Sequence, residues 1–396
     1  MQISFFYDKG TIRLFPLTLT RPADFFRVGI YRIHEKWQRL LHPKNISRLV
    51  PGYLAAQYKV DELTDEPCLW INSRLLPDFD LQHHINDLKI GQGLQHNGTP
   101  LLCLQDGMKS RQWFDAGKPD FSGVAMTEIE NPHLIVNTWD VFRMNGDQIV
   151  FDLDLHGIYS RPEKLPAGVV ADRPDQVFIE DSSIIEPGVV IISSEGPVYI
   201  GKNAYIMAGS VIRGPAAICD NATVKMGTRI YGDTTIGPYC KVGGEINNVV
   251  MFSYSNKAHD GYLGNSVIGR WCNIGADTNS SNLKNNYSMI RVNDYQTGEI
   301  VDTGLQFMGV IMGDHCMTAI NCMLTAGSLI GVSTNLFGSH FTPKLVKSFQ
   351  WVGQDNTEPY RFDKAVDAAT KMMLRRNVEM TDDYQAMLKH IHDNFC

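Results

Sequence analysis

One histidine of this chain stands where a regular sequence pattern stops. His259 lies in the stretch SNKAHDGYLGNSVIGRWCNIGA, residues 255–276, three positions before Tyr262. The unperturbed pKa of histidine lies near neutrality, so its ring can take up and release a proton at ordinary pH. We therefore consider His259 a candidate general base, while a structural loop histidine is the alternative for any lone ring.

The pattern that stops is a six-residue repeat. Eight aliphatic residues follow one another at a spacing of six: Ile200, Ile206, Ile212, Ile218, Val224, Ile230, Ile236 and Val242. Shorter sets with the same spacing come before and after: Ile179, Ile185 and Ile191; Ile268 and Ile274; Met312, Thr318, Leu324, Ile330 and Leu336. A period of six fits neither a helix nor one strand, so each aliphatic residue must recur once per short strand and corner.

Three such strands close a triangular coil of about eighteen residues, whose inward aliphatic side chains stack on those of the neighbouring coils. The repeats therefore predict a parallel β-helix of about six coils, over residues 177–345. An antiparallel sandwich with regular turns is the alternative. Proteins with similar hexapeptide repeats form left-handed coils, and this resemblance implies the same hand here.

The rest of the chain has other patterns. Residues 1–160 mix strand-like apolar runs with a helical stretch near 27–41, as expected of an α/β domain, and the proline-rich residues 161–176 indicate a linker. Residues 346–396 form a predicted helical tail, with helical spacing in 361–377 and 381–395. The buried faces are expected to carry Ala365, Ala369 and Met372 or Met373 in the first helix and Met387, Leu388 and Ile391 in the second, which Thr381 or Asp382 would cap.

Composition excludes several classes of function. The formal charge of −7 disfavours nonspecific binding to nucleic acid. The eight cysteines contain no C-x-x-C pair, so no standard zinc or redox spacing is present, and we expect them to be reduced and structural. Neither a signal peptide nor an apolar run of bilayer length is apparent, so the sequence predicts a cytoplasmic protein with no membrane partner.

A long excursion interrupts the repeats at residues 276–309. Its sequence is rich in amides and other polar groups, ADTNSSNLKNNYSMIRVNDYQTGE at its start. Loops of this length in a compact repeat are usually functional or disordered. A site for a hydroxylated ligand and a solvated flap are both open at this point.

The stretch from Arg229 to Lys284 resembles the acetyltransferase half of the bifunctional N-acetylglucosamine-1-phosphate uridylyltransferase/glucosamine-1-phosphate acetyltransferase family. An ungapped alignment on the histidine matches the following positions: Arg229, Glu245, His259, Tyr262, Leu263, Gly264, Ile268, Gly269, Asn273, Ile274, Gly275, Ala276 and Asn282. The resemblance covers about sixty residues. The hexad spacing alone would not place Arg229, His259, Tyr262 and Asn282 correctly.

This resemblance implies a role for each matched residue. His259 corresponds to the general base that deprotonates a sugar amine during its attack on the acetyl-CoA thioester. Arg229 corresponds to a phosphate-binding arginine, and Tyr262 and Asn273 to residues that contact the sugar phosphate and hold the base. Asn282 corresponds to an amide contact with the amino sugar or the thioester.

The sequence departs from that family at several positions. Asn247 replaces a lysine, Asp277 a glycine and Leu283 a tyrosine, and Lys284 matches the later phosphate-binding lysine only after a short deletion. The loss of positive charge leaves two interpretations. The acceptor differs from glucosamine-1-phosphate, or Lys257 or Lys284 holds the phosphate from another direction.

The opening of the chain, FYDKGTIRLFPLTLTRP, resembles the start of sugar-1-phosphate nucleotidylyltransferases. Matching positions are Gly10, Thr11, Arg13, Leu14, Pro16, Leu17, Thr18 and Pro22. The resemblance implies nucleotide binding by Gly10, Thr11 and Arg13, with Mg²⁺ if this domain is active. Ala23 replaces the family's lysine, and Asn72 and Ser73 replace the metal-binding Gly-Asp pair, so no metal ligand is identified. A divergent nucleotidylyltransferase and a degenerate domain both remain open.

Together, the resemblances imply a transferase of nucleotide-sugar synthesis. The β-helix would acetylate an amino-sugar 1-phosphate, most simply glucosamine-1-phosphate, and the N-terminal domain would join the product to a nucleoside triphosphate to give a UDP-sugar. Related hexapeptide acyltransferases imply a homotrimer that binds CoA along the groove between neighbouring coils. One alternative is a hexose-1-phosphate uridylyl- or thymidylyltransferase whose β-helix serves oligomerisation or regulation, and another is a non-enzymatic scaffold.

Overall fold

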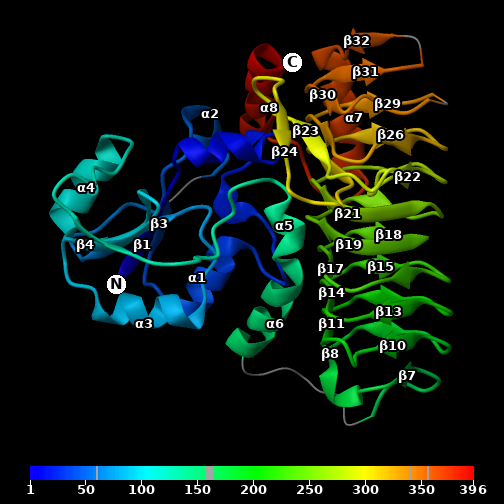
Figure 1. Cartoon of the computed structure of the whole chain (residues 1–396), viewed down its shortest axis with the longest axis horizontal. Coiled ribbons are helices and arrows are strands. Elements are labelled where there is room, and N and C mark those ends of the chain that lie inside the picture. The colour runs from blue at the N-terminus through cyan, green and yellow to red at the C-terminus, as the bar shows by residue number, and fades with distance from the viewer. Residues whose placement is uncertain (59–60, 157–163, 339, 355) are drawn as a thin grey trace. The chain divides into compact units, whose positions relative to one another are not determined.

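The computed structural model describes residues 1–58, 61–156, 164–338, 340–354 and 356–396 (Figure 1). The end of the expected N-terminal domain, 157–160, and the start of the expected linker, 161–163, lie outside the described residues. The chain divides into two compact units. The first unit comprises Met1–Leu14, Arg21–Phe26 and Tyr31–Val136, and the second comprises Phe15–Thr20, Arg27–Ile30 and Asn137–Cys396.

The first unit is an α/β domain, as the sequence predicts. Its sheet has the order β2-β1-β3-β5-β4-β6. The strands are β1 (Gln2–Phe6), β2 (Ile46–Arg48), β3 (Cys68–Asn72), β4 (Gln92–His96), β5 (Thr99–Gln105) and β6 (Ala125–Glu128), and the helices α1 (Ile33–Leu41), α2 (Gly52–Ala55), α3 (Phe79–Asp87) and α4 (Gly107–Asp115). β1 is parallel to both of its neighbours, and every residue of β1 and β3 is buried, as is typical of central strands.

The helix expected near 27–41 begins later, at Ile33. Gly29 has a φ of 82°, which a helix does not allow. The N–H groups of Gly29 and Ile30 donate instead to the side chains of Asn145 and Asp152, both at 2.7 Å. Side chains distant in sequence therefore hold residues 27–30 outside the helix.

The second unit is built on the parallel β-helix that the repeats predict, now seen as about ten turns over residues 170–352. Face 1 contains β7 (Val170–Ala171), β10 (Val190–Ile192), β13 (Val211–Arg213), β16 (Arg229–Ile230), the first halves of β19 (Glu245–Met251) and β21 (Tyr262–Ile268), β22 (Asn279–Ser280) and β27 (Met323–Leu324). Face 2 contains β9 (Ile184–Ile185), β12 (Tyr205–Ile206), β15 (Thr223–Val224), β18 (Lys241–Val242), β20 (Asn256–Lys257), β26 (Met317–Thr318), β29 (Asn335–Leu336) and β31 (Gln350–Val352). Face 3 contains β8 (Val177–Ile179), β11 (Val198–Ile200), β14 (Ala216–Ile218), β17 (Thr234–Ile236), the second halves of β19 and β21, β25 (Val310–Met312), β28 (Ser328–Ile330) and β30 (Leu345–Val346).

The hexad residues form the core of this β-helix. Tyr205 pairs with Thr223 and Thr223 with Lys241, so each regular coil takes eighteen residues, or three hexads. The inward residues following these three, Ile206, Val224 and Val242, are 0% exposed. The β-helix exceeds the six predicted coils because its outer coils carry insertions or deletions that shift the six-residue spacing.

The loss of the repeat after Val242 has a structural cause. β19 and β21 are each seven residues long and pair in parallel, and each passes from face 1 to face 3 without a break in the strand. Asn248 and Asn265, with φ of 52° and 46°, make the turn at this corner. These coils are therefore shorter than eighteen residues, and the hexad spacing cannot continue through them.

The excursion at 276–309 is folded and packs on the coils rather than forming a solvated flap. It contains β22 and the antiparallel pair β23 (Arg291–Asn293) and β24 (Ile300–Asp302). Tyr295 is 4% exposed, and its hydroxyl lies 2.8 Å from Ser348 Oγ. This contact joins the excursion to the last coils of the β-helix.

Helices pack around the coils. α5 (Asp140–Arg143) and α6 (Asn145–His156) contact face 3 through β14, β17, β19 and β21. β32 (Thr357–Pro359) pairs with β31 and leads to α7 (Phe362–Leu374) and α8 (Asp382–Phe395). The predicted helical faces are confirmed, since Ala365, Ala369, Met373 and the three residues expected in α8 are buried; the cap of α8 is Thr381, whose hydroxyl accepts from the Tyr384 N–H.

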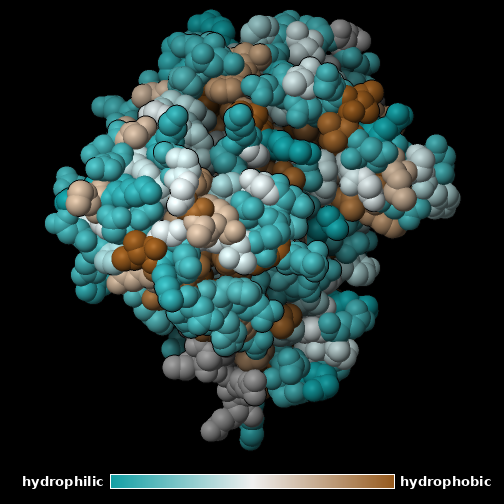
Figure 2. Space-filling model, turned by 60° about the vertical axis from the view of Figure 1, so that its left-hand side comes forward, coloured by the Kyte–Doolittle hydropathy of each residue, from teal (hydrophilic) through white to brown (hydrophobic). Residues whose placement is uncertain are grey.

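The surface seen in Figure 2 is mainly hydrophilic, with small, separated hydrophobic groups. Seven of the eight cysteines are buried, and all are free thiols. No helix among the described residues is long and apolar enough to cross a membrane.

Candidate functional site

His259 lies at the corner of the β-helix that joins face 2 to face 1. The corner follows β20 and precedes β21, and the His259 side chain is exposed. Within the described residues, the ring accepts or donates no hydrogen bond. An exposed ring without an internal partner can accept a proton from a bound ligand.

Lys257 fixes the backbone of this corner from inside the β-helix. It pairs in register with Val242, so a lysine occupies a position that is aliphatic in neighbouring coils. Its side chain is 1% exposed, and Nζ donates to the carbonyl oxygens of His259, at 2.5 Å, and Asp260, at 3.0 Å. The ammonium is directed into the coil, so the interpretation of Lys257 as a phosphate ligand is wrong.

Burial lowers the pKa of Lys257 from 10.5 to about 8, against the opposite effect of the Asp260 and Asp277 carboxylates. The unfolded chain therefore binds more protons than the folded chain between these two pH values. We expect the free energy of unfolding of the wild type, relative to Lys257→Met, to rise by up to about 3 kcal/mol between pH 8 and 10.5. Denaturant unfolding of both proteins across this range measures the difference, and a pH-independent difference would contradict the buried ammonium.

A second group of predicted residues meets on face 1. Arg229 pairs in register with Glu245, and Glu245 with Tyr262. The Tyr262 hydroxyl accepts from Asn282 Nδ2 at 2.9 Å, and the same amide nitrogen lies 2.7 Å from Asn265 Oδ1. The excursion thus contributes Asn282 to a fixed polar cluster on face 1.

The position of Tyr262 depends on a glycine in its own strand. A Cβ atom on Gly264 would lie 2.2 Å from the Tyr262 hydroxyl, so a larger residue would displace the phenol. Burial raises the pKa of Tyr262, and hydrogen bonds with Asn247 and Asn282 oppose this effect. Asn247 stands where the family of the resemblance has a lysine. Its uncharged amide forms a hydrogen bond with Tyr262.

The guanidinium of Arg229 remains accessible on the same face. Its Nε atom lies 3.6 Å from Glu245 Oε2; Arg229 is exposed and Glu245 is half-buried. Exposed ion pairs contribute little stability, so a phosphate can replace the carboxylate at low cost.

Asn273 and Lys284 do not join this cluster. Asn273 is exposed on face 2, where it bridges Asn256 and Met317 in adjacent coils. Lys284 Nζ donates to the Met289 carbonyl at 2.6 Å within the excursion. The structure therefore brings Arg229, Tyr262 and Asn282 together on face 1, next to the corner that carries His259.

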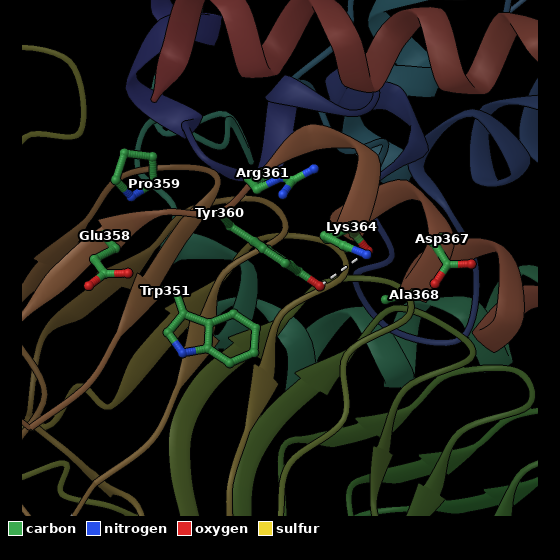
Figure 3. Close-up of a pocket in the computed structure, with 8 residues that line it drawn as sticks. All are labelled: Trp351, Glu358, Pro359, Tyr360, Arg361, Lys364, Asp367 and Ala368. Atoms are coloured by element: carbon green, nitrogen blue, oxygen red, sulfur yellow. Dashed lines mark hydrogen bonds between the residues drawn. The ribbon is translucent and has the colours of Figure 1, made fainter.

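Further along face 2, a pocket of about 500 Å³ opens between β31, β32 and α7 (Figure 3). Trp351 and Tyr360 form its aromatic wall, with ring centroids 5.2 Å apart. The cationic Arg361 and Lys364 and the acidic Glu358 and Asp367 also line it. Aromatic faces beside cations suit a planar ring that carries negative groups. Trp351 is three strands from Asn273 through Met317 and Asn335, or roughly 14 Å along the face.

In the first unit, the candidate nucleotide site lies at the carboxyl ends of β1 and β3. The parallel neighbours of β1 lie on opposite sides of it, which is the switch point where open α/β sheets bind ligands. The predicted residues Gly10, Thr11 and Arg13 lie here on a 3₁₀ helix, Lys9–Leu14. Thr11 is buried and Arg13 is exposed.

An ion pair that the sequence did not identify occupies this switch point. Arg74 Nε and Nη2 donate to Asp8 at 3.0 and 2.5 Å, and Asn72 Nδ2 donates to the same carboxylate at 3.0 Å. A Cβ atom on Gly10 would lie 2.5 Å from Arg74 Cζ, which explains why a glycine stands there. Only the joint placement of the two loops reveals this pair, since Asp8 and Arg74 are distant in sequence.

The residues at the switch point do not fit a resident Mg²⁺ ion. Mg²⁺ prefers carboxylate oxygens, and Asp8 is already bound by Arg74 and Asn72. In the part of the chain that the structure describes, no group of three or more histidine, cysteine, aspartate or glutamate side chains could hold a metal.

Comparisons with known proteins match two parts of the chain to different families. Residues 3–157 match the model described as sugar nucleotidyl transferase, and residues 197–232 match bacterial transferase hexapeptide (six repeats). Both families are transferases. The curated proteins include no match to this chain.

Solved structures with similar coils include three acyltransferases. The UDP-N-acetylglucosamine acyltransferase of Campylobacter jejuni is 12% identical, with 59% of this chain and 97% of that chain covered and a TM-score of 0.30. AntD, an N-acyltransferase from Bacillus cereus in complex with dTDP and 3-hydroxybutyryl-CoA, is 14% identical, with 53% and 91% covered and a TM-score of 0.21. The Arabidopsis UDP-N-acetylglucosamine acyltransferase is also 14% identical, with 55% and 90% covered and a TM-score of 0.18.

Proposed function

We propose that the second unit transfers an acyl group from an acyl-CoA, acetyl-CoA in the first instance, to the amine of an amino-sugar 1-phosphate. The observation that carries this proposal is the exposed ring of His259 at a corner whose backbone the buried Lys257 ammonium holds. The Tyr262–Asn282 cluster lies on the adjoining face and offers polar groups to a sugar. Glucosamine-1-phosphate is the simplest acceptor with these properties.

The reaction uses His259 as the general base. Its neutral ring takes a proton from the acceptor amine while the nitrogen attacks the thioester carbonyl. The C–N bond forms and the C–S bond breaks, so the CoA sulfur leaves and takes up a proton. Arg229 holds the acceptor phosphate, and Tyr262 and Asn282 orient the sugar.

The pocket on face 2 suits the nucleotide end of the acyl-CoA. Trp351 and Tyr360 would stack with the adenine ring, and Lys364 would face its phosphates. The acyl arm would then extend along face 2 past Asn273 towards His259. This direction follows the outward column of residues that connects Trp351 with Asn273.

We further propose a homotrimer. Several apolar side chains of the corners, the excursion and face 1 are more than half exposed within one chain: Met226, Tyr287, Ile300, Ile320 and Phe341. Contact between coils of neighbouring subunits would cover side chains of this kind.

Release of free thiol from acetyl-CoA tests the acyl transfer directly. Purified protein is incubated with acetyl-CoA and glucosamine-1-phosphate, glucosamine or no acceptor, and thiol is measured over time. We expect release that depends on the acceptor and is fastest with the phosphorylated sugar. Acceptor-independent release, or none with either sugar, would refute the proposal.

A second activity is supported by the sugar nucleotidyl transferase match over residues 3–157. We propose that the first unit transfers a nucleotidyl group, from UTP in the leading version, to a sugar 1-phosphate and releases pyrophosphate. Arg13, exposed beside the switch point, would hold the triphosphate. In the alternative version, a hexose 1-phosphate is the substrate and the β-helix serves oligomerisation.

We expect Arg13→Ala to raise the KM for the nucleotide about tenfold or more, since a charged contact to phosphate is lost. Pyrophosphate release with UTP or dTTP and a panel of sugar 1-phosphates gives the measurement. Arg213→Ala, on β13 of the β-helix and outside residues 3–157, is the control. No pyrophosphate with any pair would identify the first unit as a degenerate domain.

A further inference from the structure

Three cationic side chains converge on face 2 below the His259 corner. Lys241 points outward from β18, and Lys225 follows β15 in the preceding coil. Arg376 comes from the residues that follow α7. We call these three residues the face 2 cation cluster.

Hydrogen bonds fix Arg376 against the coils. Its Nη2 atom donates to Asn256 Oδ1 at 2.8 Å, and Nη1 lies 3.4 Å from the Tyr239 carbonyl oxygen. Asn256 pairs in register with Lys241 in the adjacent strand. The guanidinium is therefore anchored beside Lys241 instead of extending into solvent.

The cluster adjoins the corner that carries His259. The N–H of Lys225 donates to the Val242 carbonyl, which places Gly243 above Lys225 in the next coil. A Cβ atom on Gly243 would lie 3.2 Å from the His259 backbone nitrogen. Gly243, which has no side chain, is therefore the residue that lies between Lys225 and the His259 corner.

The positive charges lack carboxylate partners. In the described part of the chain, Lys225, Lys241 and Arg376 form no ion pair with an acidic residue. Burial lowers the pKa of Lys241, and the charges of Arg376, Lys225 and Arg375 lower it further. The cluster therefore presents neighbouring positive charges that an anionic ligand can contact.

We propose that the face 2 cation cluster binds a phosphoryl group of the substrate bound at His259, and we assign it to the phosphate of the acceptor sugar. This assignment rests on the proposed acyl transfer. The cluster adds positive charge from face 2 to that of Arg229 on face 1, where Asn247 replaces the lysine. A phosphate of the CoA would require the same chemistry, so the two sources must be distinguished by experiment.

Titration calorimetry on the full chain separates the sources without any turnover. The ligands are inorganic phosphate, glucosamine-1-phosphate, glucosamine and adenosine 3′,5′-bisphosphate. The variants are Lys241→Gln and Lys225→Gln, with Lys202→Gln as a control that removes an exposed lysine elsewhere on the β-helix. Lys241→Arg tests whether charge alone restores binding, and melting temperatures verify that each variant is folded.

We expect Lys241→Gln and Lys225→Gln to weaken binding of inorganic phosphate and glucosamine-1-phosphate about tenfold each, since each removes one charged contact. Lys202→Gln and Lys241→Arg should bind as the wild type does, and glucosamine should be insensitive to all variants. Weakening confined to the bisphosphate would overturn the assignment to the acceptor. Wild-type affinity of both glutamine variants for every phosphate would overturn the site itself, whether or not the protein releases thiol.

Discussion

Replacement of His259 by alanine is expected to lower kcat for acyl transfer by about 10²- to 10⁴-fold, the usual contribution of a positioned general base. Affinity for acetyl-CoA and for the sugar phosphate should change little, because the His259 ring holds no other side chain in place. The backbone of the corner should also persist, since Lys257 bonds to the main-chain carbonyl of residue 259 and not to the ring. Initial rates of thiol release at saturating substrates measure the loss.

His83→Ala is the matched control, because it removes an exposed histidine on α3 in the first unit. It should retain the wild-type rate of thiol release. A kcat within threefold of the wild type would remove His259 from the mechanism.

Replacement of Ile206 by alanine is expected to lower the free energy of unfolding of the β-helix by about 2–5 kcal/mol. Ile206 is 0% exposed and points into the column that also holds Val224 and Val242. Coils above and below restrain the cavity that the substitution leaves, so the core cannot collapse around it. Urea unfolding followed by circular dichroism at fixed protein concentration gives the value.

Ile184→Ala is the matched control on the same face. Ile184 is 60% exposed and pairs with the outward residue of β12, Tyr205. Its substitution should change the free energy of unfolding by less than about 0.5 kcal/mol. Equal effects of the two substitutions would contradict the assignment of inward and outward positions.

The hexads predicted the core of the β-helix because each coil repeats the same local requirement. Ile212, Ile218 and Ile230 are all at most 2% exposed, as the spacing alone indicates. The buried faces of the helices at the end of the chain were equally predictable, since helical periodicity puts Ala365 and Ala369 on one face. Features set by residues close in sequence were therefore predictable.

Features that depend on distant contacts were not. The sequence around Lys257 is that of a surface lysine. It does not indicate that the ammonium lies inside the coil and donates to two backbone carbonyl oxygens. The sequence offered one indication of its inward position. Lys257 stands fifteen residues after Val242, so the two residues occupy equivalent positions if the coil between them is three residues shorter than the regular eighteen. The delayed start of α1 depends on Asn145 and Asp152, which no local pattern connects with Gly29.

The candidate site also contains residues that the sequence identified and residues that only the structure revealed. The resemblance identified His259, Tyr262 and Asn282, and the structure then showed that Tyr262 and Asn282 touch. The face 2 cation cluster could be recognised only in the structure, because Arg376 reaches Asn256 from the turn that follows α7, far from β15 and β18 in sequence. Lys225 and Lys241 are visible as outward residues of two successive coils, but their convergence with Arg376 is not.

A structure of the protein with CoA bound tests acyl transfer at His259. We expect the adenine ring to lie against Trp351 and Tyr360 and the pantetheine arm to lie along face 2. The sulfur atom should lie within about 4 Å of the His259 ring, which is the reach of a reacting group near its base. A CoA molecule bound away from this corner, with its sulfur remote from His259, would contradict acyl transfer at this site.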